Sequence, residues 1–279
     1  MNCRLRSKTF KRVALWALLG AAVVFYGFPY VYLVLTSFKS PGAALEIPPQ
    51  VWPSHFTFTN YSSVLEQPGI VKAFVNSIVI AVLATAISVL LAVPAAYGVV
   101  RYRTRAGRVF VTGALVVRMV PAIAIGVPFV GLMARLHLTD TQLGVALAHI
   151  TIALPLSIWL MSSFFEATPM ELEESARIDG CSRLGALARV IVPITSGGIA
   201  VTAVFAFLAS WNDFLFALLL TAQRSETVPV MIGNFQTEYG DEWASMTALA
   251  VLYSLPVVVA TLLFQRKIVS GLTLGAVKG

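Results

Sequence analysis

The sequence predicts an all-α integral membrane protein with six membrane-spanning helices and both termini in the cytoplasm. Of its 279 residues, 58% are hydrophobic and only 12% are charged, a composition far too apolar for an ordinary soluble domain. Six apolar segments reach the length of about 20 helical residues that crosses a hydrocarbon core of roughly 30 Å. The Lys and Arg residues, which give a formal net charge of +7, are concentrated in alternate connections between these segments.

The six segments are expected to be helices because lipid cannot satisfy loose backbone groups. The first follows a basic start, as a signal peptide does. It is nevertheless longer than a usual signal-peptide core and lacks a clear small-x-small cleavage site, so we interpret it as a retained helix. In order, the expected spans are Val13–Leu35, Ser77–Val100, Val109–Leu132, Leu143–Phe165, Ile199–Leu220 and Met246–Phe264.

Lys and Arg residues predict the orientation. The N-terminus, residues 101–108, the connection before Pro193 and the C-terminus hold five, four, three and three of the 20 cations. The alternate connections contain only Lys39, Lys72, Arg135 and Arg224. By the positive-inside rule, both termini are cytoplasmic. The expected domains are a cytoplasmic N-terminus (1–12), a six-helix transmembrane domain (13–265) and a cytoplasmic C-terminal tail (266–279).

An external lip is expected over residues 37–72, where five prolines favour short turns over one long helix. This segment is too small for a binding domain. In the second span, small residues recur every four positions and let a neighbouring helix approach closely. We interpret this stripe as packing rather than substrate contact; it consists of Ala84, Ser88, Ala92 and Ala96.

The cysteines and histidines indicate neither a disulfide framework nor a metal site. Cys3 and Cys181, the only cysteines of the sequence, are both expected on the cytoplasmic side. His55, His137 and His149 lie in different segments without a second ligand at metal spacing, so ordinary roles are expected for them. No nucleic-acid partner is predicted, because the cations lie between apolar runs rather than on one folded polar face.

The cytoplasmic connection between the fourth and fifth spans (166–195) carries consistent helix signals. Thr168 and Glu171 have the spacing of a capping box, and Pro169 suits the first helical position. The acidic residues Glu171, Glu173 and Glu174 complement the positive end of the helix dipole. The sequence therefore predicts a helix that starts at Pro169.

A sharp turn and a second helix are expected next. Gly180 fits the left-handed position that ends a helix, and Ser182 can cap the following one. The second helix would carry Leu184, Leu187, Val190 and Ile191 on one side. Together the two helices would form a stiff cytoplasmic knob that can transmit a push. The alternative is an interfacial amphipathic loop that only joins two spans.

Eight residues of this connection follow a fixed spacing: Glu174, Ser175, Ala176, Asp179, Gly180, Val190, Val192 and Pro193. They resemble the EAA motif of bacterial ABC importer permeases, which reads Glu-Ala-Ala, three residues, Gly, nine residues and Ile-x-Leu-Pro. The spacing matches throughout. The departures at Ser175, Val190 and Val192 are conservative.

Further resemblance covers nearly the whole chain and points to the MalG-type branch of carbohydrate ABC importer permeases. The C-terminal part is similar to permeases of actinobacterial trehalose-type importers. The matching pieces are FTFTNY (56–61), FVNS (74–77), AAYGVVRY (95–102), WNDF (211–214) and the ending GLTLGAVKG.

The resemblance implies a type I ABC importer permease in a bacterial inner membrane, working by alternating access. It implies a second, homologous permease, an ABC ATPase dimer that binds ATP and Mg, and an extracytoplasmic solute-binding protein that delivers a carbohydrate. The EAA-like residues would seat in a cleft of the ATPase, and the C-terminal tail with Gly275 and Lys278 would lie near the ATPase pair.

The chain itself is predicted to be no enzyme and to bind no cofactor. There is no Walker A motif, because Gly271, Gly275 and Lys278 have the wrong spacing and follow no strand. No Ser-His-Asp set or carboxylate pair can be assembled from the sequence in an external pocket. ATP hydrolysis is therefore expected on the partner.

Two charges lie within predicted spans, Arg118 in the third and Asp213 in the fifth. They differ in depth by roughly 8 Å, so they could pair only if the helices tilt. Trp211, Asn212 and Asp213 form a candidate wall of the translocation cavity, to which Arg118 could add. The alternatives are an interhelical hydrogen-bond cluster or a partner-subunit contact at Asp213, and an Arg118 that only extends toward the cytoplasm.

Two other classes of protein compete with this interpretation. An ion-coupled secondary transporter would show inverted halves, broken helices and a buried carboxylate, and Asp213 is the only candidate carboxylate. A membrane scaffold would leave the capped knob without a purpose. For an importer, the cargo stays open between trehalose, another oligosaccharide, an amino sugar and a glycerophosphate-like solute.

Overall fold

The computed structural model describes residues 2–40, 42–237 and 240–274. This part of the chain is helical apart from connections and a two-residue antiparallel strand pair, which agrees with the predicted all-α class. Its helices and strands are α1 (Asn2–Ser37), η1 (Gly42–Leu45), α2 (Thr59–Glu66), α3 (Ile70–Tyr102), α4 (Arg105–Val117), α5 (Ala122–Arg135), α6 (Gln142–Glu166), α7 (Glu171–Ile178), α8 (Arg183–Ala186), η2 (Leu187–Ile191), α9 (Val192–Ile194), α10 (Ser196–Trp211), α11 (Leu215–Leu220), α12 (Val228–Gly233), β1 (Gln236–Thr237), β2 (Gly240–Asp241) and α13 (Trp243–Leu274).

Packing divides the chain into two compact units. The first comprises Met1–Pro68 and Ile232–Leu255, and the second comprises Gly69–Met231 and Pro256–Gly279. The second unit contains the connection between α6 and α10 and both charges predicted within spans. The candidate functional site described below therefore lies within the second unit.

In the first unit, the segment after α1 folds into short turns, as its prolines predicted. Asn60 of α2 donates from Nδ2 to the carbonyl oxygens of Ser37 (2.8 Å) and Lys39 (2.7 Å). Lys39, only 1% exposed, donates from Nζ to the carbonyl of Gln50 (2.6 Å) and lies 4.7 Å from the centre of the Tyr32 ring. These contacts fasten the lip segment to the end of α1.

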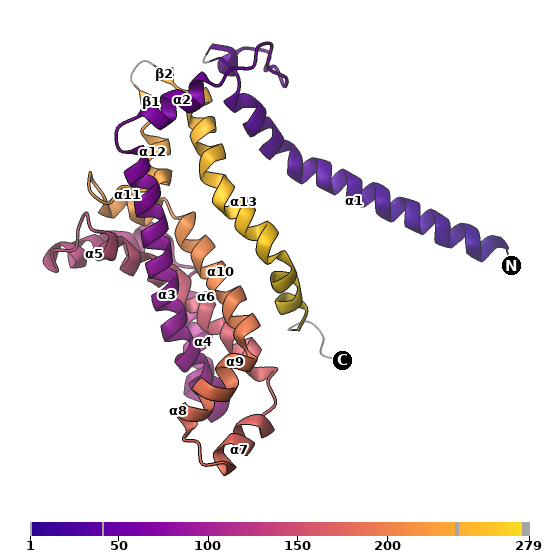
Figure 1. Cartoon of the computed structure of the whole chain (residues 1–279), viewed down its shortest axis with the longest axis vertical. Coiled ribbons are helices and arrows are strands. Elements are labelled where there is room, and N and C mark those ends of the chain that lie inside the picture. The colour runs from indigo at the N-terminus through magenta and orange to yellow at the C-terminus, as the bar shows by residue number, and fades with distance from the viewer. Residues whose placement is uncertain (1, 41, 238–239, 275–279) are drawn as a thin grey trace. The chain divides into compact units, whose positions relative to one another are not determined.

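In the second unit, α3, α6 and α10 pack along one another, and α7 and α8 lie at one end of these helices (Figure 1). The small-residue stripe of α3 faces this packing, since Ala84, Ser88, Ala92 and Ala96 are all completely buried. Its interpretation as a packing surface is therefore correct. The absence of bulky side chains on this face lets the helices come close together.

Gly198 of α10 marks another close approach. A Cβ atom at this position would overlap the ring of Phe164 in α6, whereas a Cβ at the neighbouring Gly197 would meet open space. The contact between α6 and α10 therefore requires a residue without a side chain at position 198.

The third predicted span is not one straight helix, contrary to the expectation for Val109–Leu132. It consists of α4 and α5, which meet at an angle of 97°. Pro121 precedes α5 and has no N–H to donate, so a helix cannot continue through it without losing a hydrogen bond. Before it, the N–H groups of Arg118, Met119 and Val120 donate three residues back, as in tight turns.

The fifth predicted span, Ile199–Leu220, is interrupted as well. α10 ends at Trp211 and α11 begins at Leu215. Hydrophobicity alone made the segment appear continuous, because WNDF is only a short polar interruption between apolar residues.

Four helical stretches of the described chain are long and apolar enough to cross a membrane: Arg12–Ser37, Ile70–Tyr102, Gln142–Glu166 and Trp243–Leu262. The number rises to six if each of two bent pairs, α4 with α5 and Arg183–Ile194 with α10, forms one span. The predicted multi-pass membrane fold is confirmed in this form. The cytoplasmic position of the termini stays a prediction.

Candidate functional site

The connection between α6 and α10 turns sharply at Gly180, as predicted. The N–H of Cys181 donates to the carbonyl of Ala176 (3.0 Å), and the N–H of Gly180 donates to that of Arg177 (3.1 Å). This pair of bonds is the Schellman arrangement that closes a helix. Gly180 has φ +89°, in the left-handed region where side chains cause strain. A glycine is therefore required by the turn itself.

The second helix begins where its cap was predicted. Ser182 Oγ accepts the N–H of Gly185 at 3.1 Å, which satisfies one of the free donors at the start of α8. Leu187 and Ile191 are buried, but Leu184 is 72% exposed, so the predicted common apolar side is wrong for Leu184. Leu184 lies in the first turn of α8, directly after the corner at Gly180, whereas Leu187 and Ile191 lie in the π-helical turn η2 that follows.

The predicted capping box is also wrong. α7 begins at Glu171 rather than Pro169, and its N-cap residue, Met170, makes no side-chain cap. The hydroxyl of Thr168 instead donates to the carbonyl of Phe164 at 2.9 Å. Thr168 thus satisfies one of the free carbonyl groups at the end of α6 and is not available to cap α7.

The EAA-like residues lie mainly on the exposed face of this connection. Glu174, Ser175, Asp179, Gly180 and Pro193 are exposed, whereas Ala176 faces inward and is 7% exposed.

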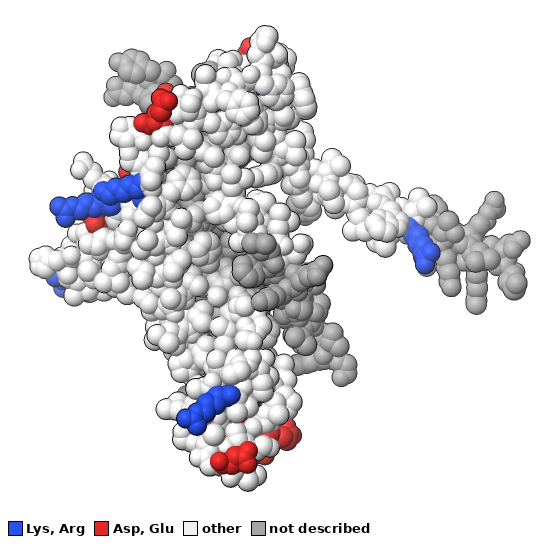
Figure 2. All heavy atoms as spheres, viewed as in Figure 1, with Lys and Arg blue, Asp and Glu red and all other residues white. Residues whose placement is uncertain are grey.

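Two large aliphatic side chains share the exposed face, since Ile178 is 86% exposed and Leu184 is 72% exposed. Figure 2 shows acidic and basic side chains gathered at the end where α7 and α8 lie. We call α7, the turn at Gly180 and α8 the knob. Its surface combines exposed aliphatic groups with charges, as a protein docking surface does.

Glu173 points the opposite way from Glu174 and is 4% exposed. Its Oε2 lies 2.9 Å from Nε of Arg101, and its Oε1 accepts the hydroxyl proton of Tyr97 at 2.6 Å. Arg101 and Tyr97 both belong to α3. Sequence reasoning missed this cluster: it counted Arg101 as an orienting charge and Glu173 as a partner of the helix dipole, and no local pattern links residues 76 positions apart.

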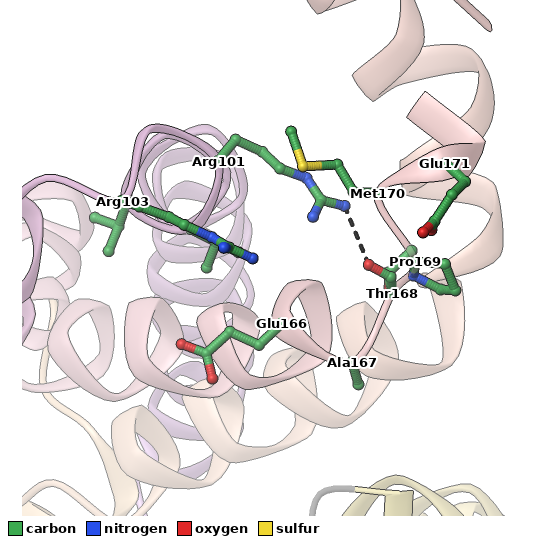
Figure 3. A pocket seen from close by; sticks show the side chains of 10 residues that line it. Arg101, Arg103, Glu166, Ala167, Thr168, Pro169, Met170 and Glu171 are labelled. Carbon is green, nitrogen blue, oxygen red and sulfur yellow. Dashed lines mark hydrogen bonds between the residues drawn. The ribbon is translucent and has the colours of Figure 1, made fainter. Parts of the chain in front are cut away.

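A cavity of about 700 Å³ lies beside this cluster, between the end of α3 and the connection from α6 to α7. Arg101 reaches across it and donates from Nη2 to the carbonyl of Thr168 at 3.4 Å (Figure 3). Arg103 and Glu166 also line the cavity. Its wall is therefore mixed in charge.

Asp213 lies in the break between α10 and α11. Its Oδ1 accepts the N–H of Phe216 (2.9 Å) and of Ala217 (3.3 Å), which caps α11. The same oxygen lies 3.1 Å from Nε2 of His149 in α6, and Nδ1 of His149 lies 2.7 Å from Oγ of Ser210. The interhelical hydrogen bond at this place joins His149 to Ser210, and Asp213 lies beside it.

Ser210, His149 and Asp213 do form a Ser-His-Asp chain, which the sequence had not predicted. Ser210 is 4% exposed and His149 is 1% exposed, so the chain is buried inside the helix packing rather than facing an external pocket. It links α6 to the break after α10.

The other residues assigned to the cavity wall differ in exposure. Trp211 is 2% exposed and stacks on Phe207, with 5.3 Å between ring centres. Asn212 is exposed and donates from Nδ2 to the carbonyl of Leu208 at 2.9 Å. Arg118 is exposed at the end of α4, and the side chain that lies 3.1 Å from the Asp213 carboxylate is that of His149. Gly275 and Lys278 lie outside the described residues.

A third polar cluster surrounds Asp140, in the connection between α5 and α6. Its carboxylate accepts the N–H groups of four consecutive residues, Ala222 to Ser225, at 3.0 to 3.2 Å. Burial alone would raise the pKa of Asp140, but these backbone donors outweigh it and hold the pKa well below the usual range of a carboxyl group. Asp140 thereby joins two connections 82 residues apart.

The comparisons with known proteins agree on one family. The model of the family described as binding-protein-dependent transport system inner membrane component matches residues 84–272. The chain is 37% identical over 273 residues to the trehalose transport system permease protein SugB of Mycobacterium tuberculosis, covering 96% of this chain and 99% of the relative. It is 35% identical over 281 residues to the trehalose/maltose transport system permease protein MalG of Thermococcus litoralis, covering 99% and 100%.

A solved structure has the same fold. It is the crystal structure of a bacterial ABC transporter involved in the import of the acidic polysaccharide alginate. The superposition has a TM-score of 0.76 at 23% identity and covers 94% of this chain and 97% of the matched chain.

Proposed function

The chain belongs to the family of binding-protein-dependent transport system inner membrane components, and from this membership we propose that it is one permease of an ATP-driven sugar importer. In this proposal it pairs with a second, homologous permease and with two copies of an ABC ATPase. An extracytoplasmic binding protein delivers the solute. The chain is the non-catalytic membrane subunit, and ATP with Mg binds the ATPase.

The observation that carries the proposal is the knob. Its Schellman turn and Ser182 cap hold two short helices in a defined shape. The exposed Ile178 and Leu184 give it an apolar surface of the kind that partners bury, next to the exposed Glu174 and Asp179. An interfacial loop would also bury aliphatic groups, but the polar face of such loops is rich in Lys and Arg, so the exposed Glu174 and Asp179 favour a protein partner.

We assign the coupling to the ATPase to Glu174, Ser175, Ala176, Asp179, Gly180 and Pro193, in which the buried Ala176 packs behind the exposed residues that make the contact. Closure of the two ATPase subunits around ATP would then move the knobs of the two permeases together and open the cavity outward, and hydrolysis would reset it. The C-terminal tail with Gly275 and Lys278 is assigned a place near the ATPase pair. Both assignments require the knob on the cytoplasmic side.

The cargo assignment rests on the relatives, which are named for trehalose, trehalose/maltose and diacetylchitobiose transport. We propose a disaccharide or similar sugar. Within the candidate cavity wall, the exposed Asn212 and Arg118 are accessible to a solute, whereas the packed Trp211 and Asp213 support the wall from behind. A full sugar site requires the second permease.

Gentle solubilisation of the tagged chain from its bacterial membrane tests the proposal. We expect a second permease and an ATPase to co-purify, with two ATPase copies per permease pair. Proteoliposomes of the purified complex, supplied with the binding protein, should take up labelled trehalose or maltose only when ATP reaches the ATPase. Recovery of a homomeric transporter without an ATPase would contradict the proposal and favour an ion-coupled transporter. A complex that hydrolyses ATP but transports neither sugar would contradict only the proposed cargo.

A further inference from the structure

We propose that Arg101, Glu173 and Tyr97 form a latch that transmits movement of the knob to α3. The inference rests on the proposed function, because it needs an ATPase that moves the knob. It assigns a positioning role to three residues outside the EAA-like pattern. The latch joins the first helix of the knob to a membrane-spanning helix at two points.

The geometry of the latch favours a strong connection. The Arg101 and Glu173 side chains are only 8% and 5% exposed, and their charged atoms are 2.9 Å apart. Two charges removed from water are costly unless each has its partner, and removal of one partner leaves the other buried and uncompensated. Tyr97 donates its hydroxyl proton to the second carboxylate oxygen. Glu173 is therefore held at both oxygens and cannot swing away without losing both contacts.

Two contact points on one helix transmit a movement more completely than a single contact point does. Tyr97 and Arg101 are four residues apart in α3, so their side chains lie on one face and a turn apart. A helix held at two such points resists pivoting about either. α7 consequently has two functional faces, with Glu173 and Ala176 turned inward and Glu174, Ser175 and Ile178 outward.

α3 is suited to carry the movement further. It is an unbroken helix of 33 residues that packs against α6 and α10 through its small-residue stripe. A displacement at Arg101 therefore reaches residues deep in the membrane. The cavity beside Arg101 leaves room next to the connection from α6 to α7. Within the described residues, the polar ties from α3 across this region include the latch, the Arg101–Thr168 hydrogen bond and the guanidinium of Arg183 in α8, which lies 5.1 Å from the centre of the Tyr102 ring.

The test measures movement of α3 in the complete transporter. The chain has two cysteines, Cys3 and Cys181, and both are replaced by serine. Leu90 of α3, which is 74% exposed, is replaced by cysteine and labelled with an environment-sensitive fluorophore. The emission shift caused by a non-hydrolysable ATP analogue is then recorded in nanodiscs. The latch variants are Glu173→Gln, Arg101→Gln and the double variant, and the control is Glu166→Gln, an exposed carboxylate at the end of α6.

We expect the latch variants to assemble with the ATPase and to bind nucleotide. The emission shift at position 90 should fall roughly tenfold, which lies within the roughly 5- to 150-fold effects typical of coupling between two sites. The double variant should lose no more of the emission shift than either single variant, because each single substitution already removes the same contact. Glu166→Gln should keep the full shift.

Three results would overturn the latch. In the first, the emission shift persists in Glu173→Gln. In the second, the labelled parent shows no emission shift although nucleotide binds. In the third, only the latch variants fail to assemble with the ATPase, which would mean that the contact only supports the fold of the knob. If the parent itself purifies without an ATPase, the proposed function fails and the latch loses its role with it. That result is distinct, since it appears before any latch residue is changed.

Discussion

Nε2 of His149 in α6 lies 3.1 Å from Oδ1 of Asp213, the residue that caps α11 across the break in the fifth apolar segment. The contact ties a broken helix to an intact one inside the packing of the second unit. An acidic residue within an apolar segment is explained by the two backbone N–H groups, of Phe216 and Ala217, that its carboxylate accepts.

Replacement of His149 by leucine should destabilise the protein by about 1–3 kcal/mol, since it leaves the half-buried Asp213 and the buried Ser210 with fewer polar contacts. The thermal unfolding of the purified protein in detergent measures this. His55→Ala, at an exposed position of the first unit, is the control and should change little. Equal unfolding temperatures for His149→Leu and the parent would show that the contact contributes no stability.

Asp140→Asn should lower the unfolding temperature by roughly 2–4 °C near neutral pH, because a neutral amide accepts the four backbone N–H groups more weakly. Asparagine tolerates the left-handed backbone at this position (φ 52°), so the comparison isolates the charge.

The pH dependence of that difference follows from the lowered pKa of Asp140. A carboxyl group whose folded pKa is depressed adds stability fully above its unfolded pKa of about 3.9 and loses it as pH falls through the folded value. Unfolding scans from pH 7 to pH 3 should therefore show the parent and Asp140→Asn converging below about pH 4. A constant difference over this range would contradict the assignment.

Gly180→Val should uncouple ATP hydrolysis from uptake while the chain still inserts into the membrane. A Cβ at this position meets open space, so the effect comes from backbone strain of about 1–3 kcal/mol at φ +89° rather than from a clash. Gly180→Asn is the matched control, because asparagine adopts the left-handed region more readily. Uptake per ATP hydrolysed is the measurement, and normal coupling in Gly180→Val would contradict the role of the turn.

Gly198→Ala and Gly197→Ala form a matched pair. The first should destabilise the protein by about 1–3 kcal/mol, because its Cβ would overlap the ring of Phe164 and push α6 from α10. The second should be neutral or slightly stabilising, since its Cβ meets open space in a helix. Unfolding in detergent compares them, and equal stabilities would refute the close approach of the two helices.

Local rules explain what could be predicted along the chain. The knob follows from residues that act on their near neighbours: Gly180 accepts a left-handed backbone, and Ser182 caps the residues directly after it. The packing stripe of α3 follows from a simple four-residue repeat of small side chains. The capping box at Thr168 was wrong for a related reason, since two neighbouring helix ends competed for one hydroxyl group.

Hydrophobicity by itself determined that this chain crosses a membrane several times, because the free energy of placing a segment in lipid depends on the sum of its side chains and little on their partners. Only the tertiary structure decided where the third and fifth segments break and which charged residues meet. Arg101 and Glu173 are far apart along the chain, as are His149 and Asp213, and no periodicity encodes such a pairing. Burial makes the charges of Arg101 and Glu173 depend on each other, and burial exists only after the helices have packed.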